Sequence, residues 1–264
     1  MAEHEGDIAV VTGGSKGIGA AIARNLARDG ADVAISYLRD RESAEKTRAE
    51  LEELGVRAIA VKCYLRDAEQ PRALISEARK QLGEPTLLVS NAASGVFRQV
   101  LDLKSTHWDL AMNTNAAALL RLTQACRELR GVIAVTSQGS QRVLPGYGSV
   151  GVSKAALEAL VRYLAVEMAP DTRVNALCPG LVATRSSEQL LPMIELQKTM
   201  TEATTPMRRL VTTEDVANYA SFLLSSRAAM VTGQVHVIDG GQSVSFGLTM
   251  EFLRTEQMRT VDDS

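Results

Sequence analysis

Short apolar runs alternate with longer segments of helical periodicity along most of the chain. The apolar runs are rich in Val, Ile and Ala and lack in–out alternation, which indicates strands covered on both faces of a sheet. This order is typical of βαβ units and a parallel sheet. We predict seven strands, at residues 8–11, 32–36, 57–61, 86–89, 132–136, 173–177 and 234–238.

The segments between these runs predict helices. Two longer helices are expected, one from a capping-box-like Thr-His-Trp-Asp at Thr106 to about 129, the other from about 149 to 168, before Pro170. Three shorter ones, at 18–28, 41–54 and 68–82, each end near a glycine that would stop them.

We expect a single doubly wound α/β domain over residues 1–264, with helices on both faces of a seven-stranded parallel sheet. Two segments fall outside the repeating pattern. Residues 181–211 follow a strand's C-terminal end and carry Pro192 and Pro206, so we interpret them as a substrate lid. The tail at 243–264 is too apolar to stay in water and is expected to pack on the domain or on a neighbouring subunit.

Charge and composition narrow the functional classes. With 29 basic and 31 acidic residues the net charge is −2, which argues against nucleic-acid binding. The apolar run near the N-terminus is too short for a signal segment or a membrane span, so a cytoplasmic protein without a membrane partner is expected. Neither the cysteines nor the histidines have ligand spacing, and we predict no metal; they are Cys63, Cys126, Cys178, His4, His107 and His236.

A glycine-rich loop lies between the first predicted strand and the first predicted helix. Glycines there permit a tight turn and the close approach of a pyrophosphate, whose charge a helix N-terminus stabilises. A glycine loop in this position predicts a dinucleotide site. Its candidate residues are Gly13, Ser15, Lys16, Gly17, Ile18 and Gly19.

The spacing of this loop, TGxxxGxG, resembles the short-chain dehydrogenase/reductase family, and the resemblance covers nearly the whole chain. Further signatures follow in order, at Asn91-Ala92-Ala93, Asn115, Ser137, Lys154, 179–184 and Asp239-Gly240-Gly241. The resemblance implies a Rossmann-type fold and a homotetramer formed through the two long helices. It also implies that Asn91 supports the cofactor site, that Lys154 holds the nicotinamide ribose, and that Val182 and Thr184 meet the nicotinamide amide.

The choice of dinucleotide follows from charge. An acid at the end of the second strand would bind the adenosine ribose of NAD and repel a 2′-phosphate. Here that strand ends without an acid before Asp40, and Lys16 and Arg39 offer cations for the phosphate, so NADPH is favoured over NADH. Where many family members have an aspartate beside the adenine, this chain has Tyr64 and Leu65.

The catalytic tyrosine is displaced relative to the commonest pattern of the family. Val150 stands four residues before Lys154, whereas the nearest phenol, Tyr147, stands seven residues before it and shares its helix face. This Tyr-x6-Lys spacing, with text such as Val-Gly-Val-Ser-Lys-Ala-Ala-Leu-Glu-Ala-Leu, resembles the enoyl-acyl-carrier-protein reductase branch.

Reduction of an enoyl thioester explains why the phenol would move. Hydride goes to Cβ while negative charge develops on the thioester oxygen, several bonds away, where Tyr147 would act as an oxyanion donor. Lys154 would supply cofactor binding and positive charge, Ser137 would order Tyr147 or contact substrate, and Asn115 would hold the helix and a water path. Apolar candidates for an acyl pocket are Phe97, Leu144, Met193 and Met207.

The residues leave alternatives open. One is a carbonyl reductase of the same family that acts on a 3-oxoacyl thioester or another ketone. Another is a sensor that binds the dinucleotide without turnover. The carrier of the acyl group, acyl carrier protein or coenzyme A, cannot be read from the sequence.

Overall fold

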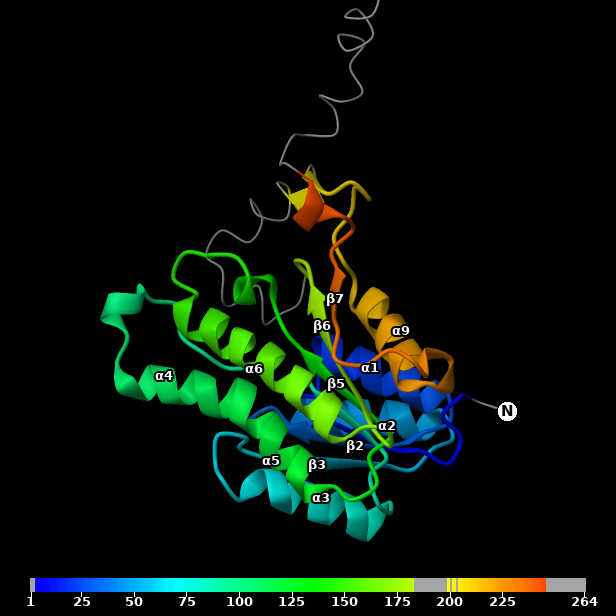
Figure 1. The fold of residues 1–264 in the computed structure, drawn as a ribbon. Coiled ribbons are helices and arrows are strands. Elements are labelled where there is room, and N and C mark those ends of the chain that lie inside the picture. Colours follow the sequence, from blue (N-terminus) through cyan, green and yellow to red (C-terminus); the bar gives the residue numbers. More distant parts are fainter. Residues whose placement is uncertain (1–2, 183–198, 200, 203, 246–264) are drawn as a thin grey trace, which may run out of the picture.

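The computed structural model describes residues 3–182, 199, 201–202 and 204–245. Seven parallel strands form one sheet in the order β3-β2-β1-β4-β5-β6-β7 (Figure 1). The strands are β1 (Ile8–Val11), β2 (Asp32–Tyr37), β3 (Ala58–Lys62), β4 (Leu87–Ser90), β5 (Gly131–Val135), β6 (Arg173–Pro179) and β7 (Val235–Ile238). The predicted doubly wound parallel sheet is confirmed, with strand ends shifted by a residue or two.

Helices cover both faces of this sheet (Figure 1). One face carries α1 (Gly17–Arg28), α2 (Arg41–Glu53) and α9 (Thr213–Leu224), and the other carries α3 (Gln70–Gln81), α4 (Ser105–Ala111), α5 (Ala118–Ala125) and α6 (Gly148–Glu167). The strand order reverses between β1 and β4, where neighbouring connections leave toward opposite faces. The carboxyl ends of these strands therefore form the crevice in which such folds bind ligands.

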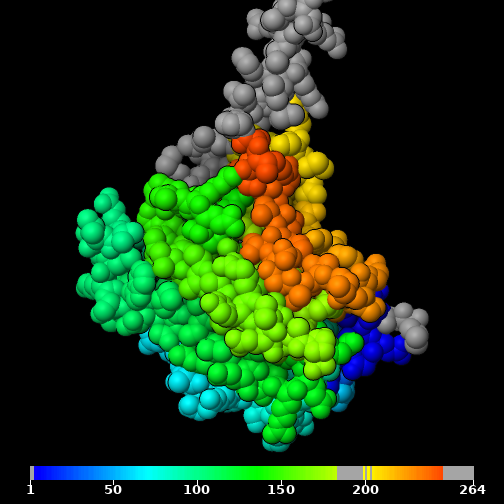
Figure 2. Space-filling model, viewed as in Figure 1, coloured from blue at the N-terminus to red at the C-terminus, as the bar shows by residue number. Residues whose placement is uncertain are grey.

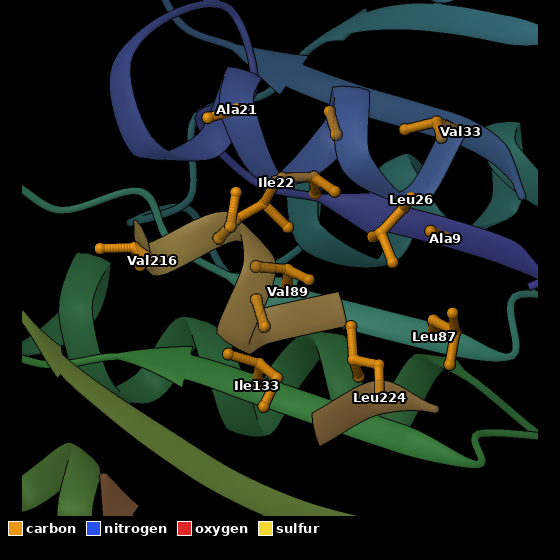
Figure 3. Packing of buried hydrophobic residues seen from close by; sticks show 14 of the residues in the cluster. Ala9, Ala21, Ile22, Leu26, Val33, Leu87, Val89, Ile133, Val216 and Leu224 are labelled. Atoms are coloured by element: carbon orange, nitrogen blue, oxygen red, sulfur yellow. The ribbon is translucent and has the colours of Figure 1, made fainter. Parts of the chain in front are cut away.

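The core on the α1 side shows how the helices reach the sheet (Figure 3). Ile22 and Leu26 of α1 and Val216 and Leu224 of α9 are buried against strand residues such as Val89. Alanines along α1 let the two helices approach closely, because they add little bulk between the backbones. This packing fixes the N-terminal end of α1 over the carboxyl ends of β1 and β4.

The predicted long helix at 106–129 begins where expected, whereas it ends before residue 129 and is not α-helical throughout. It begins at Ser105 with Lys104 as N-cap, it passes through a π-helical turn at Met112–Ala117, and α5 ends at Ala125. The extra residue in the π turn directs Asn115 toward neighbouring backbone, and such turns are common at functional sites. The capping box expected at Thr106 is absent, since the backbone N–H of Lys104 donates to His107 Nδ1 instead, at 3.3 Å.

Helix α9 was missed from the sequence, although its start carries a recognisable signal. Thr212 accepts from the backbone N–H of Asp215 at 3.1 Å, and the Asp215 carboxylate accepts from the backbone N–H of Thr212 at 2.8 Å. This reciprocal pair is a capping box. Most of the predicted lid at 181–211 and of the tail at 243–264 lies outside the described residues.

Candidate active site

The glycine loop after β1 has the shape that the sequence predicts. Gly13 and Gly17 have positive φ, at 63° and 58°, which favours glycine. The loop is held against the end of β2, because the backbone N–H of Gly13 donates to Ser36 Oγ at 3.2 Å. A Cβ on Gly19 would lie 2.4 Å from Gly13 O, so the start of α1 packs directly on the loop.

Asn91 fastens this loop to the end of β4. Its Nδ2 donates to Thr12 O at 3.0 Å and to Gly13 O at 3.2 Å. Its backbone N–H donates to Thr12 Oγ1 at 3.0 Å, as does that of Ala92 at 3.1 Å. The Asn91 side chain therefore holds the glycine loop by the loop's backbone oxygens. Its support of a bound cofactor stays a prediction.

The N-terminus of α1 fits a dinucleotide pyrophosphate. Its N-cap, Lys16, caps no backbone N–H with its side chain, and the first turn contains no acidic residue. First-turn N–H groups and the helix dipole together attract an anion. The loop glycines leave room for the phosphates to approach, so the residues present fit this group.

Two cationic candidates for a 2′-phosphate lie beside the end of β2. Arg39 is exposed, and Lys16 Nζ lies 3.3 Å from Asp40 Oδ2 in a half-exposed pair. The pKa of the Asp40 carboxyl lies below its usual value, chiefly because it accepts hydrogen bonds from Ser43 at the start of α2 and, to a lesser degree, from Lys16. Exposed pairs of this kind are weak, so Lys16 is available to an incoming phosphate.

The residues after β3 divide between the surface and the core. Tyr64 is half-buried, and the guanidinium of Arg66 lies 4.5 Å from the centroid of its ring. Leu65 is buried in the hydrophobic cluster on the α3 side, so its side chain is part of the core. Of these two candidates for adenine contact, Tyr64 alone presents part of its side chain to solvent.

The displaced phenol begins helix α6. Tyr147 is the N-cap of the helix, and Lys154 lies two turns further along. Val150, one turn before Lys154, is buried, and a Cβ on Gly95 would lie 2.2 Å from its Cγ2. The position that usually carries the phenol is therefore filled by an aliphatic side chain packed on residue 95.

The Tyr147 ring packs between the backbone of Gly139 and the ring of Phe97. A Cβ on Gly139 would lie 2.5 Å from Tyr147 Cδ1, so the ring rests on that backbone. On another side the ring of Phe97 lies with its centroid 5.4 Å away, tilted by 54°. Arg98 joins this wall, since its backbone N–H donates to Gly146 O at 2.9 Å.

The Tyr147 hydroxyl is kept in its protonated form. Burial raises the pKa of the phenol, and a hydrogen bond with the Ser137 side chain opposes this effect in part. Ser137 lies directly after β5, and its Oγ accepts from the backbone N–H of Gly139 at 3.2 Å. Tyr147 and Ser137 thus stand together, and the phenol is a hydrogen-bond donor at neutral pH.

Lys154 is almost fully buried, with 4% of its surface exposed. Its Nζ donates to Val135 O, the last residue of β5, at 2.6 Å. Burial lowers the pKa of this ammonium to about 8. The lysine is therefore anchored on the end of β5, and its ammonium loses a proton at a lower pH than an exposed lysine does.

Asn115 links three segments of the site. Its Oδ1 accepts from the backbone N–H of Ser94 at 2.8 Å, and its Nδ2 donates to Ser94 O at 2.9 Å and to Ser153 Oγ at 2.8 Å. The predicted role in holding the helix thus has a physical basis, since Ser153 precedes Lys154. The water path remains a prediction.

The other predicted site residues are placed as follows. Val182 is buried in a short parallel bridge with Val211, whereas Thr184 and Met193 lie outside the described residues. Leu144 borders Gly139, 3.6 Å from the Cβ that residue would carry. Met207 lines a cavity of ≈ 400 Å³ together with Tyr219 and Val237, and Tyr147 is not part of that lining.

Several residues of the site escaped the sequence reasoning. Ser36, Gly139 and Gly151 matter through contacts that no spacing rule reveals. Glu158 had a signal, because a carboxylate one turn after Lys154 interrupts an otherwise apolar helix face. Among the described residues no three His, Cys, Asp or Glu side chains cluster in a way that could hold a metal, and no described helix is long and apolar enough to span a membrane.

Comparison with known proteins agrees with this geometry. A family model described as Enoyl-(Acyl carrier protein) reductase matches residues 13–243. The chain is 38% identical over 245 residues to Dehydrogenase/reductase SDR family member 4 from Sus scrofa, covering 90% of this chain and 87% of that protein. The chain belongs to the short-chain dehydrogenase/reductase family. Membership makes it an oxidoreductase.

Other members of the short-chain dehydrogenase/reductase family extend the comparison. The chain is 36% identical over 245 residues to 1-cyclohexenylcarbonyl-CoA reductase from Streptomyces collinus, covering 90% of this chain and 87% of that protein. Among solved structures, a short chain dehydrogenase from Burkholderia cenocepacia J2315 in complex with NADP superposes with a TM-score of 0.83, at 32% identity over 91% of this chain and 99% of the other. A 7α-hydroxysteroid dehydrogenase complexed with NADH gives 0.85, at 30% identity over 90% and 95%. The first of these two structures holds NADP and the second holds NADH.

Proposed function

We propose that the protein reduces the trans-2 double bond of an enoyl thioester with NADPH. One observation carries the proposal: the phenol at the N-terminus of α6 stands seven residues before Lys154, while the buried Val150 fills the position one turn before it. A proton donor in this place suits an oxygen that lies further from the hydride acceptor than a ketone oxygen does. The acyl group would be carried by acyl carrier protein or coenzyme A.

The residues of the site suit the charge changes of this reaction. When bound, NADPH would supply the hydride that the substrate accepts at Cβ. Tyr147 donates a hydrogen bond to the thioester oxygen as the enolate develops, an interaction on the order of 3 kcal/mol in comparable oxyanion sites. Because burial raises its pKa, Tyr147 stays protonated through neutral pH and keeps this role. Solvent water then gives a proton to Cα of the enolate and leaves as hydroxide, which completes the reduction.

Lys154 and the glycine loop bind and orient. By the family resemblance Lys154 holds the nicotinamide ribose, and its anchor on Val135 O fixes the height of its ammonium in the site. Ser137 orders Tyr147 from the end of β5, and Asn91 keeps the loop in its binding shape. Two comparisons support the thioester substrate: the matching family model is described as Enoyl-(Acyl carrier protein) reductase, and a relative of 36% identity is named 1-cyclohexenylcarbonyl-CoA reductase.

The preference for NADPH rests on charge beside the end of β2. Lys16 and Arg39 supply positive charge there, and the first acid after the strand, Asp40, is occupied as the N-cap of α2. We expect Arg39→Ala to weaken NADPH binding at least tenfold and to leave NADH binding within about twofold, since a charged hydrogen bond contributes about 1.5–3 kcal/mol. Equal losses for both nucleotides would contradict this assignment.

The decisive experiment compares crotonyl-CoA with acetoacetyl-CoA as substrates, by the loss of NADPH absorbance. Wild type should reduce the enoyl substrate, and Tyr147→Phe should lose at least about a hundredfold in turnover. Tyr163→Phe is the matched control, because Tyr163 lies exposed on the same helix. Turnover of the ketone alone would refute the proposal and favour a carbonyl reductase. NADPH binding without turnover of any thioester would refute it and favour a dinucleotide-binding sensor.

The outer surface of α6 supports assembly into a homotetramer through the long helices. Tyr163 and Val166 are 69% and 79% exposed there, and Val152 is nearly half exposed. Apolar side chains grouped on one helix face are typical of protein interfaces. Light scattering should give four times the mass of the chain, and Val166→Glu should reduce it; a wild-type monomer would refute the assignment.

A further inference from the structure

A carboxylate is buried in the face of α6 that carries the catalytic residues. Tyr147, Gly151, Lys154 and Glu158 follow one another at spacings of four, three and four residues, which places them on one side of the helix. Glu158 is 5% exposed, and acidic side chains are almost never buried without partners. The Tyr147 and Lys154 contacts described above leave its role unexplained.

Two hydroxyl groups hold the Glu158 carboxylate. Thr136 Oγ1 donates to Glu158 Oε1 at 2.7 Å, and Ser140 Oγ donates to the same oxygen at 2.5 Å. Thr136 directly follows Val135, whose carbonyl accepts from Lys154. Two consecutive residues at the end of β5, Val135 and Thr136, therefore bond to side chains on consecutive turns of α6. Lys154 and Glu158 together hold the helix on the strand.

The second hydroxyl belongs to the turn that supports the catalytic phenol. Ser140 closes the 3-10 turn Gln138–Ser140, and its Oγ also lies 2.8 Å from Ser137 O, so its single proton is shared between this carbonyl and the Glu158 carboxylate. That turn carries Gly139, on which the Tyr147 ring rests. A Cβ on Gly151 would lie 2.5 Å from Gly139 O, so the turn packs directly on α6. A shift of the turn relative to the helix would therefore move the Tyr147 ring.

The charge of Glu158 also matters to its neighbours. Its electrostatic field favours the protonated form of Lys154, against the cost of burying that ammonium. The other group that faces Lys154 is the thiol of Cys178 on β6, and burial raises the pKa of that thiol to about 12. The charge of Asp239 also raises the pKa of the Cys178 thiol, and the charge of Arg142 lowers it. Glu158 is thus the acidic side chain on α6, one helical turn after Lys154, whose charge favours the ammonium form of the lysine.

A further contact joins this turn to the C-terminal side of the fold. Gln138 Nε2 donates to Asp239 Oδ2 at 3.1 Å, and Arg142 donates to Ser243 O. Figure 2 shows the orange-red segment at 239–245 beside the green segment that contains the turn. These contacts hold the outer side of the turn, whereas Glu158 holds its inner side.

We propose that Glu158 is a positioning residue of the active site, which fastens the turn beneath Tyr147 to helix α6 and places a carboxylate one helical turn from Lys154. The catalytic part of this inference rests on the proposed function; the effect on Lys154 does not. Two measurable consequences follow from the two contacts. Loss of the charge should change the pH dependence of the site, and loss of the hydrogen bonds should lower turnover.

The test separates charge from hydrogen bonding. Glu158→Gln keeps an acceptor oxygen but removes the charge, so the alkaline loss of turnover should move down by about one pH unit from its wild-type position. Glu158→Asp keeps the charge but is one methylene shorter, so turnover should fall at least about tenfold with the alkaline limb unmoved. Ser140→Ala should behave like Glu158→Asp. Glu167→Gln removes a charge at an exposed position of the same helix and should change neither quantity.

NADPH affinity measured against pH, by nucleotide fluorescence, reports on Lys154 without any acyl substrate. If wild type binds NADPH but reduces no enoyl thioester, the proposed function fails, and the shift in this binding curve for Glu158→Gln still tests the inference. An unchanged curve for Glu158→Gln would overturn the role of the charge. Wild-type turnover in Glu158→Asp and Ser140→Ala would overturn the positioning role, and these variants decide that point even if Glu158→Gln does not fold.

Discussion

Replacement of Asn115 by alanine tests whether one buried amide holds the site together. The variant removes three hydrogen bonds, two of them to the backbone of Ser94. With Asn115 only 1% exposed, the N–H and C=O of the partly buried Ser94 and the buried hydroxyl of Ser153 would each lose a partner. An unsatisfied buried group costs about 1–3 kcal/mol, so the loss in unfolding free energy should be about 3–5 kcal/mol.

Thermal unfolding measures this loss directly. A change of that size corresponds to a fall in Tm of about 6–15 °C for a protein of this length, followed by calorimetry or circular dichroism. Turnover should fall as well, because Ser94 lies three residues after Asn91 and Ser153 stands beside Lys154. A urea titration should show a lower midpoint with an unchanged slope, if the folded state alone is affected.

Asn113 is the matched control. It lies in the same π-helical turn, but its Nδ2 donates to Asp109 O at 2.9 Å and its Oδ1 accepts from Arg121 Nη2 at 2.9 Å, at a partly exposed position. Water can replace these bonds, so Asn113→Ala should cost about 1 kcal/mol or less. A Tm for Asn115→Ala within about 2 °C of wild type, or equal losses for the two variants, would refute the argument from buried hydrogen bonds.

Three further variants probe the site. Gly139→Ala should cut turnover at least about tenfold at unchanged NADPH affinity, because the new Cβ would lie 2.5 Å from the Tyr147 ring; wild-type kinetics would contradict that contact. Gly19→Ala should abolish nucleotide binding, measured by fluorescence, since its Cβ would lie 2.4 Å from Gly13 O. Lys154→Met should remove turnover yet raise the Tm at pH 7: burial lowers the pKa of the lysine to about 8, so the protonated side chain destabilises the folded state below that pH. This gain should shrink as the pH rises from 8 toward 10.5, and a gain independent of pH would contradict it.

The fold was largely predictable because its signals are local. Apolar runs without alternation predicted seven buried strands, and Gly30, Gly55 and Gly83, which all have positive φ, marked helix ends correctly. The π-helical turn within the helix predicted at 106–129 was not predictable in the same way. Its apolar periodicity continues through the π turn, and the turn is stabilised by contacts of Asn115 with Ser94 and Ser153, which are distant in sequence.

The candidate site divides along the same line. Spacing placed Tyr147 and Lys154 on one helix face, because both lie on or at the start of one regular element. Position along the chain does not reveal that Val150 fills the space over Gly95, or that Gly139 supports the phenol. Nor does it reveal that Leu65 belongs to the core while Tyr64 reaches the surface.

The sequence by itself determined the succession of strands and of all the main helices except α9 along the chain, the glycine loop, and the displacement of the phenol by three residues from its usual place. These are properties of neighbouring residues, and helix and strand geometry translate them directly into structure. The tertiary structure alone decided which groups meet at the end of β5: a lysine on Val135, a glutamate on Thr136 and Ser140, and a phenol on Gly139. Burial there sets the protonation of Tyr147 and Lys154, and burial depends on how segments distant in sequence pack together.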